Sequence, residues 1–135
     1  MMQLDENRGP RRVILIADDK QSNRELLRTI LEHASYAVVE AADGDEAVLM
    51  ASEVSPHLII LDIHMPKKDG FGVIRELRKD PSLRALPIMA LTASASLDEK
   101  DRIIGSGFDA CLTKPIGPAK LREAVASLLQ SSSIA

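Results

Sequence analysis

Short apolar runs and longer amphipathic segments alternate along the chain. The apolar runs lack strict alternation of apolar and polar residues, which is typical of strands buried on both faces of a sheet. They cover residues 13–17, 37–41, 58–61, 88–91 and 110–113. Apolar residues recur at helical spacing in the segments between them, with stripes in residues 26–34, 47–51, 71–77 and 121–129. This alternation predicts an α/β domain with a parallel sheet and helices on both faces.

The helix expected over residues 97–106 has the weakest pattern. Ser96 and Glu99 form a plausible capping box before it, and Gly105 and Gly107 end it. Its body is mostly charged, so we expect it to be the least stable element.

The two ends of the chain differ from its centre. Residues 1–11 are polar and include a Gly-Pro pair, and residues 131–135 read SSSIA. We therefore expect a loose leader, one domain over residues 12–130 and a frayed tail. The apolar runs stay far below the roughly 18 residues of a membrane span, and the N-terminus lacks a signal-peptide core. These features predict a cytoplasmic protein without a membrane partner.

Composition excludes several kinds of site. The net charge is −3, and the aromatic residues are two Phe and one Tyr, so we expect no direct contact with nucleic acid. Cys111 is the single cysteine, which excludes an internal disulfide and a cysteine-based zinc site.

Polar residues follow the predicted strands where each strand ends. Asp18 and Asp19 follow the first strand, Asp62 follows the third, Thr92 the fourth and Lys114 the fifth. Because the carboxyl ends of parallel strands share one edge, these side chains are expected to converge there.

Each of these residues also has a purely structural interpretation. Asp18 or Asp19 could cap the first helix, and Asp62 could begin a turn. Thr92 suits a strand, and Lys114 could be a solvated loop residue. The structural interpretation requires four independent coincidences, each at the correct end of a strand, so we favour a shared site.

Electrostatics indicates the chemistry of that site. Two carboxylates about 4 Å apart repel by about 1 kcal/mol in water and about 4 kcal/mol at an effective dielectric near 20. Lys114 can offset one charge, and a divalent cation can offset the others. Hard oxygen donors suit Mg²⁺. Thr92 and Lys114 could then flank a phosphoryl group that Asp62 accepts as a carboxylate nucleophile.

The motifs VILIADD, LIILDIHMPKKDG, IMALTA and LTKPI together resemble the receiver domain of two-component response regulators, the CheY-like family. Longer stretches, such as DDKQSNRELLRTILE, are similar to single-domain regulators of the DivK type and to receivers attached to hybrid histidine kinases. The resemblance implies a flavodoxin-like, doubly wound (βα)5 fold with strand order 2-1-3-4-5.

The resemblance also implies a metal site. Asp62 would be the phosphoacceptor and would ligate Mg²⁺ directly with Asp19, whereas Asp18 would act through a bound water. The backbone carbonyl of His64 would complete the protein ligands, and Mn²⁺ could substitute. We expect the His64 side chain itself to be exposed, because hard Mg²⁺ prefers oxygen. This side chain could still tune hydrolysis of the acyl phosphate.

The resemblance assigns the switch residues too. Thr92 and Lys114 would contact the phosphoryl oxygens, and the Lys114–Pro115 peptide bond would be cis. Three residues before the lysine the family usually carries Tyr or Phe, whereas this chain has Cys111. A small thiol cannot swing as a ring does, so coupling between Thr92 and position 111 is in doubt. We interpret the thiol as inert.

The function implied is a phosphorylation-controlled signalling module. A histidine kinase, a histidine phosphotransfer protein or a small acyl phosphate would phosphorylate Asp62, and the new charge would shift the loop over residues 92–96. The face formed by the fourth helix, fifth strand and fifth helix would then bind a downstream protein. We expect a monomer or weak homodimer, without enzymatic activity beyond self-catalysed phosphotransfer and autodephosphorylation.

Two other functions are compatible with parts of the pattern. Haloacid-dehalogenase phosphohydrolases also form an aspartyl phosphate, but their nucleophile lies on the first strand in an Asp-x-Asp motif. Here His64 stands where the second acid would be. The chain could also be an interaction module with a vestigial site, which the change at Cys111 alone supports. We expect a stand-alone regulator, although a receiver fragment of a larger regulator or hybrid kinase would look the same.

Overall fold

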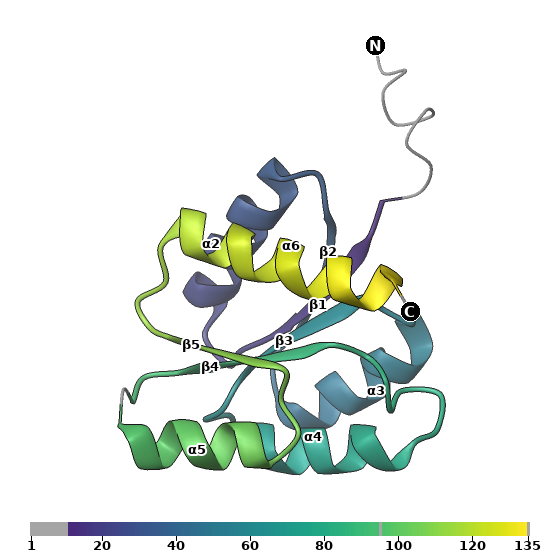
Figure 1. The fold of residues 1–135 in the computed structure, drawn as a ribbon, viewed down its shortest axis with the longest axis vertical. Coiled ribbons are helices and arrows are strands. Elements are labelled where there is room, and N and C mark those ends of the chain that lie inside the picture. The colour runs from purple at the N-terminus through teal and green to yellow at the C-terminus, as the bar shows by residue number, and fades with distance from the viewer. Residues whose placement is uncertain (1–10, 95, 135) are drawn as a thin grey trace.

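The computed structural model describes residues 11–94 and 96–134. A five-stranded parallel sheet with the order β2-β1-β3-β4-β5 forms its centre (Figure 1). The strands are β1 Val13–Ala17, β2 Ala37–Ala41, β3 Leu58–Asp62, β4 Ile88–Thr92 and β5 Ala110–Thr113. This is the predicted doubly wound topology, with each strand within one residue of its predicted bounds.

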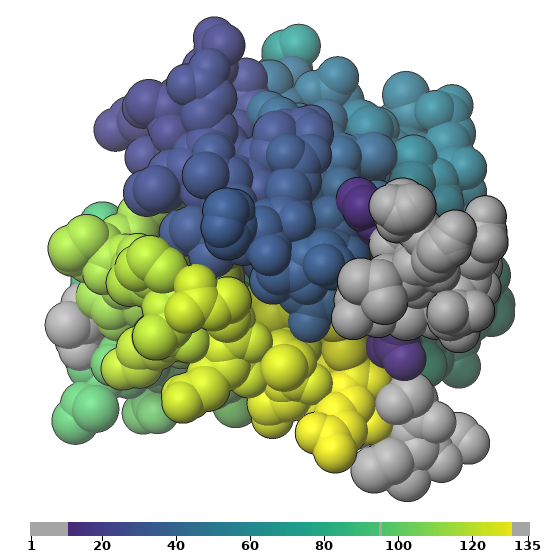
Figure 2. Space-filling model, turned by 90° about the horizontal axis from the view of Figure 1, so that it is seen from above, coloured from purple at the N-terminus to yellow at the C-terminus, as the bar shows by residue number. Residues whose placement is uncertain are grey.

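Helices cover both faces of the sheet. They are α2 Gln21–His33, α3 Gly44–Val54, α4 Gly70–Lys79, α5 Leu97–Gly105 and α6 Pro118–Ile134. Helices α2 and α6 pack side by side on one face (Figure 2), and α3, α4 and α5 lie on the other (Figure 1). Each face has its own apolar core, with Leu61 in the core under α3, α4 and α5 and Ile60 in the core under α2 and α6.

The central strands have no polar face. All residues of β3 and β4 are buried, because helices cover both sides of the sheet and the runs are uninterrupted by polar residues. Pairing of Asp62 with Leu91 and of Thr92 with Thr113 keeps the carboxyl ends of β3, β4 and β5 level. The register therefore places the polar residues that follow these strands at one edge.

Side-chain caps begin three of the helices. Asp43 accepts a hydrogen bond from Glu46 N at the start of α3, and Asp69 accepts one from Gly72 N at the start of α4. Ser96 accepts one from Glu99 N at 3.1 Å, as predicted, but its own N–H donates to the Ser94 hydroxyl. The start of α5 thus has one of the two hydrogen bonds of the predicted capping box, the one from Glu99 N to the Ser96 hydroxyl.

The ends of the chain differ in part from the prediction. Helix α6 continues to Ile134, past the expected domain end at residue 130, and the frayed tail over residues 131–135 stays a prediction. The segment contains no Gly or Pro that would end the helix, and backbone hydrogen bonding continues through the serines. Residues 1–10 and 135 lie outside the described residues, so the loose leader stays a prediction. Within the described ranges, every helix is too short or too polar to span a membrane.

Candidate functional site

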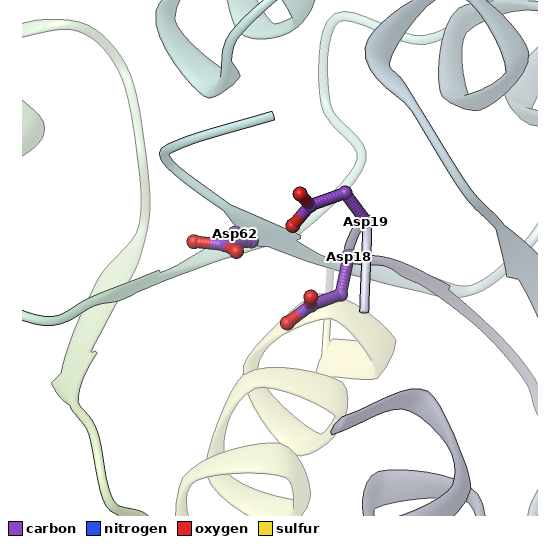
Figure 3. Close-up of side chains that lie close together, drawn as sticks. All are labelled: Asp18, Asp19 and Asp62. Carbon is purple, nitrogen blue, oxygen red and sulfur yellow. The ribbon is translucent and has the colours of Figure 1, made fainter. Parts of the chain in front are cut away.

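Three carboxylates converge at the carboxyl edge of the sheet (Figure 3). Asp18 and Asp19 follow β1, and Asp62 is the last residue of β3. One oxygen from each carboxylate lies within 4.8 Å of the others. Asp18 and Asp62 are buried, whereas Asp19 is exposed. The predicted convergence of these three acids is therefore present, with one acid open to solvent.

Lys114 joins the two buried carboxylates. Its Nζ lies 3.2 Å from Asp18 Oδ2 and 3.2 Å from Asp62 Oδ2. The backbone fixes the lysine at this position, because Lys114 N donates to the Thr92 carbonyl at 2.8 Å. The Lys114–Pro115 peptide bond is cis. The lysine is therefore a part of the acidic cluster rather than a solvated loop residue.

Asp18 is held by the start of α2. Its carboxylate accepts hydrogen bonds from Lys20 N at 2.9 Å and from Asn23 Nδ2 at 3.2 Å. The N-cap of α2 is Lys20, without a side-chain cap, so Asp18 and Asp19 do not act as the N-cap residue. Sequence reasoning missed Asn23. Its position in the first turn of the helix after the acid pair was the available signal.

Asp62 lies in an environment that resists ionisation. Burial raises the pKa of its carboxyl group, Lys114 opposes this effect, and the charge of Asp18 adds to it. The carboxylate also accepts a hydrogen bond from His64 N at 3.2 Å, so Asp62 does begin the following turn. It is a turn residue and a member of the cluster at once.

Thr92 is fully buried at the end of β4. Its hydroxyl oxygen accepts a hydrogen bond from Ser94 N at 3.1 Å, which closes a turn at the start of the β4–α5 loop. Any inward movement of the hydroxyl must break or rearrange this turn. Thr92 is therefore coupled to the loop through its own side chain.

His64 and Cys111 lie outside the carboxylate cluster. The His64 side chain is 72% exposed, and its Nε2 lies 3.8 Å from Glu99 Oε2 on α5. Sequence reasoning did not anticipate this contact. Cys111 is half-buried in β5, and burial is the main cause that raises the pKa of its thiol. A raised pKa disfavours the thiolate, which agrees with the interpretation of Cys111 as inert.

The sequence of the chain matches a known protein family. The sequence signature of the family described as "Response regulator receiver domain" matches residues 14–126. The chain belongs to this family. Receiver domains are signalling domains of two-component systems, and they interact with histidine kinases and downstream effectors. Membership of this family therefore favours the signalling interpretation over the phosphohydrolase interpretation.

Two individual response regulators are similar to this chain in sequence. The chain is 44% identical over 119 residues to the probable transcriptional regulator ycf27 of Cyanophora paradoxa, covering 87% of this chain and 48% of that protein. It is 34% identical over 116 residues to the polar-differentiation response regulator DivK of Brucella anthropi, covering 86% and 94%. The chain thus spans about half the length of the ycf27 protein and nearly all of DivK.

A solved structure extends the comparison. The receiver domain of a sensor histidine kinase from Pseudomonas aeruginosa superposes with a TM-score of 0.84 at 29% identity, covering 90% of this chain and 99% of that one. That structure is described with a magnesium ion coordinated in its active-site cleft. The fold of this chain is therefore that of a solved histidine-kinase receiver domain.

Proposed function

We propose that this receiver domain accepts a phosphoryl group on Asp62 and changes its binding to a partner protein in response. One observation supports this most strongly: the Lys114 Nζ lies 3.2 Å from each of two buried carboxylates, Asp62 and Asp18. A purely structural ion pair needs one acid for one base, whereas here Lys114 faces Asp18 and Asp62, with Asp19 beside them. The uncompensated negative charge favours a site that binds cations.

The donor set fits Mg²⁺, with Mn²⁺ as a substitute. Asp19 and Asp62 would ligate the ion directly, Asp18 through a water, and His64 through its backbone carbonyl. The carboxylates are hard oxygen donors, no thiol or imidazole belongs to the described cluster, and exposed Asp19 leaves a path for a hydrated ion. When bound, the cation would offset the charge of the carboxylates and of an incoming phosphate.

The transfer reaction uses Asp62 as the nucleophile. A carboxylate oxygen attacks the phosphorus atom, and the P–N bond of a donor phosphohistidine or the P–O bond of a small acyl phosphate breaks. The leaving group departs with the bonding electrons. Lys114 and Thr92 would contact the phosphoryl oxygens, and Lys114 is already positioned at Asp62. Water later hydrolyses the acyl phosphate and restores the carboxylate.

The phosphodonor would approach beside α2. A groove of about 330 Å³ opens on Asp18 and Lys114 and is otherwise lined mainly by apolar side chains. Leu26, on α2, lines this groove and is 55% exposed. A helix of a histidine kinase or phosphotransfer protein could cover this leucine and present its phosphohistidine to Asp62.

The readout face would comprise α5, β5 and α6. Phosphorylation would draw in Thr92 and rearrange the turn that its hydroxyl makes with Ser94, which moves the start of α5. Leu97 and Ile104 lie two turns apart on α5 and are 76% and 54% exposed, so they offer apolar contacts to a partner. Cys111 lies on this face and cannot act as a swinging ring, so the signal would pass through the loop.

The proposal also includes the wider setting of the domain. We place the domain over residues 12–130, in the cytoplasm, as a monomer or weak homodimer without turnover beyond phosphotransfer to and hydrolysis from its own Asp62. Similar sequences occur in a relative of comparable length, DivK, and in a longer one, the ycf27 protein.

Phosphate-affinity electrophoresis tests the proposal. The parent protein is incubated with acetyl phosphate with and without Mg²⁺, beside Asp62→Asn and the control Asp101→Asn, which changes an exposed acid on α5. We expect a Mg²⁺-dependent shift in the parent and the control, and none in Asp62→Asn. An equal shift in Asp62→Asn, or no shift in the parent, would contradict the proposal. Steady turnover of an aryl phosphate by the parent would instead support a phosphohydrolase.

A further inference from the structure

A groove between α4 and α5 is lined by several cationic side chains, although the protein as a whole is acidic. It has a volume of about 360 Å³ and lies on the side of α5 that faces α4, away from the proposed readout face. Its lining residues are Phe71, Ile74, Arg75, Arg78, Lys79, Arg102 and Ser106. Four of these seven are cationic and none is acidic, although the chain carries a net charge of −3.

One of the four cations has a structural role. Arg78 donates to Leu86 O at 2.7 Å and to Gly107 O at 2.8 Å, and it pairs with Asp109 at 2.9 Å. These bonds tie α4 to the segments before β4 and β5. Arg78 therefore needs no ligand, and the case for a site depends on the other three cations.

The other three cationic residues are exposed to solvent. Arg75 and Lys79 are exposed one turn apart on α4, and neither makes an ion pair or side-chain hydrogen bond with any residue in the described ranges. The Arg102 guanidinium lies over the Phe71 ring, with Cζ 3.9 Å from the ring centroid. Stacking orients this guanidinium while leaving its N–H groups available to carboxylates.

This arrangement is unfavourable without an anionic partner. Like charges four residues apart destabilise a helix, and an acid at one of these positions would relieve the repulsion. Positions 75 and 79 on α4 are exposed, so packing does not exclude an acid there. The neighbouring acid on this helix, Glu76, pairs with Lys68 instead of with these cations. Three uncompensated cations around a hollow match the geometry by which proteins recognise carboxylates.

We propose that the groove between α4 and α5 docks an acidic segment, rich in Asp or Glu, of a partner protein. A nucleic acid fits less well. The negative charge of the whole domain repels a long polyanion, and bases lack a stacking platform because Arg102 already covers the Phe71 ring. Carboxylates on a short peptide need only the local charge of Arg75, Lys79 and Arg102.

Fluorescence anisotropy with a labelled glutamate-rich peptide tests this proposal. The double variant Arg75→Gln/Lys79→Gln is compared with Lys120→Gln/Arg122→Gln, which removes the same charge from exposed positions on α6, across the sheet. At low salt we expect the parent and the α6 variant to bind alike, and the α4 variant to bind about fivefold more weakly or worse. A peptide with Gln in place of Glu should not bind.

Three results would overturn the proposal. They are no binding of the peptide to the parent at low salt, equal weakening in the two double variants, and binding of a duplex oligonucleotide but not of the peptide. Neither double variant touches the carboxylate cluster, so each should still be phosphorylated with acetyl phosphate. The outcome is thus independent of the proposed phosphoacceptor function.

Discussion

Two regions that border the carboxylate site differ in how tightly they are packed. One is strand β3 with helix α4, and the other is strand β5 with helix α5. All residues of β3 are buried, and α4 buries five of its ten residues. Every residue of β5 is only half-buried, and α5 buries Ile103 alone among its nine residues. The phosphoacceptor candidate thus belongs to the firmly packed region, while two of the candidate readout elements, β5 and α5, form the loosely packed one.

This difference suits a signalling domain. An acid that must meet a metal and a phosphodonor needs a fixed position, and elements that change conformation come from the less stable parts of a fold. Lys114 connects the two regions, because it follows β5 and contacts Asp62 at the end of β3. Phosphorylation at the fixed acid can therefore bias the position of the loosely packed elements.

A pair of leucine truncations should show the difference most strongly. Leu58 in β3 is fully buried, whereas Leu112 in β5 packs partly exposed against the same core, under α2 and α6. Leu58→Ala should lower the free energy of unfolding by about 3–4 kcal/mol, and Leu112→Ala by about 1 kcal/mol. Urea denaturation measures both. Equal losses would show that the two regions are packed alike.

Two glycine-to-alanine substitutions, one against the loop after β3 and one in α5, should change the free energy of unfolding in opposite directions. A Cβ at Gly44, at the start of α3, would overlap the backbone carbonyl of Lys68 in the loop after β3. Gly44→Ala should therefore cost about 2–3 kcal/mol of stability. A Cβ at Gly105, at the end of α5, meets no heavy atom within 4 Å, so Gly105→Ala should gain about 0.5–1 kcal/mol. Urea denaturation checks the opposite signs; a harmless Gly44→Ala would refute the tight packing of this loop.

Removal of the lysine between the regions should have a smaller effect. Lys114→Gln leaves Asp18 and Asp62 without their shared cation, and the lysine side chain is 26% exposed. We expect a loss of about 2 kcal/mol, below the roughly 3–5 kcal/mol typical of fully buried pairs. Mg²⁺ should restore part of it. Lys120→Gln on α6, an exposed control, should change the unfolding free energy by no more than about 0.5 kcal/mol.

The pH dependence of Asp62→Asn should give the smallest effect. Because burial raises the pKa of Asp62 in the folded protein, its ionised form costs stability above the folded pKa, and this cost disappears below the unfolded pKa. With a chelator present, Asp62→Asn should therefore be more stable than the parent at neutral pH. The gap should close as the pH falls.

Added Mg²⁺ should reverse that order. A cation that binds only the folded parent at ten times its dissociation constant adds about 1.4 kcal/mol of stability. Thermal unfolding across pH, with chelator or Mg²⁺, measures both effects. A parent more stable than Asp62→Asn in chelator at neutral pH would argue against a strained acidic cluster.

Much of the fold was predictable because burial on both faces leaves an unambiguous sequence pattern. The runs that became β3 and β4 contain no polar residue before their ends, so their bounds follow from composition. The continuation of α6 past Gln130 was not predicted, because serines are indifferent helix formers and leave no clear sign of a helix in the sequence.

The site was predictable to the extent that strand ends determine it. Asp18, Asp62 and Lys114 meet because parallel strands align their carboxyl ends. Asn23 was not found, since its contact with Asp18 depends on the direction in which α2 leaves the sheet. The cationic groove was not found either, because it combines residues of α4 and α5 that no sequence pattern relates.

Identifying the phosphorylated residue is the most direct test of whether Asp62 is the phosphoacceptor. The protein is phosphorylated with acetyl phosphate and Mg²⁺, reduced with borohydride, which converts an acyl phosphate on aspartate to homoserine, and digested for mass spectrometry. We expect homoserine at position 62, and none in a sample prepared with chelator. Homoserine at Asp18, Asp19 or elsewhere, with Asp62 unmodified, would contradict it.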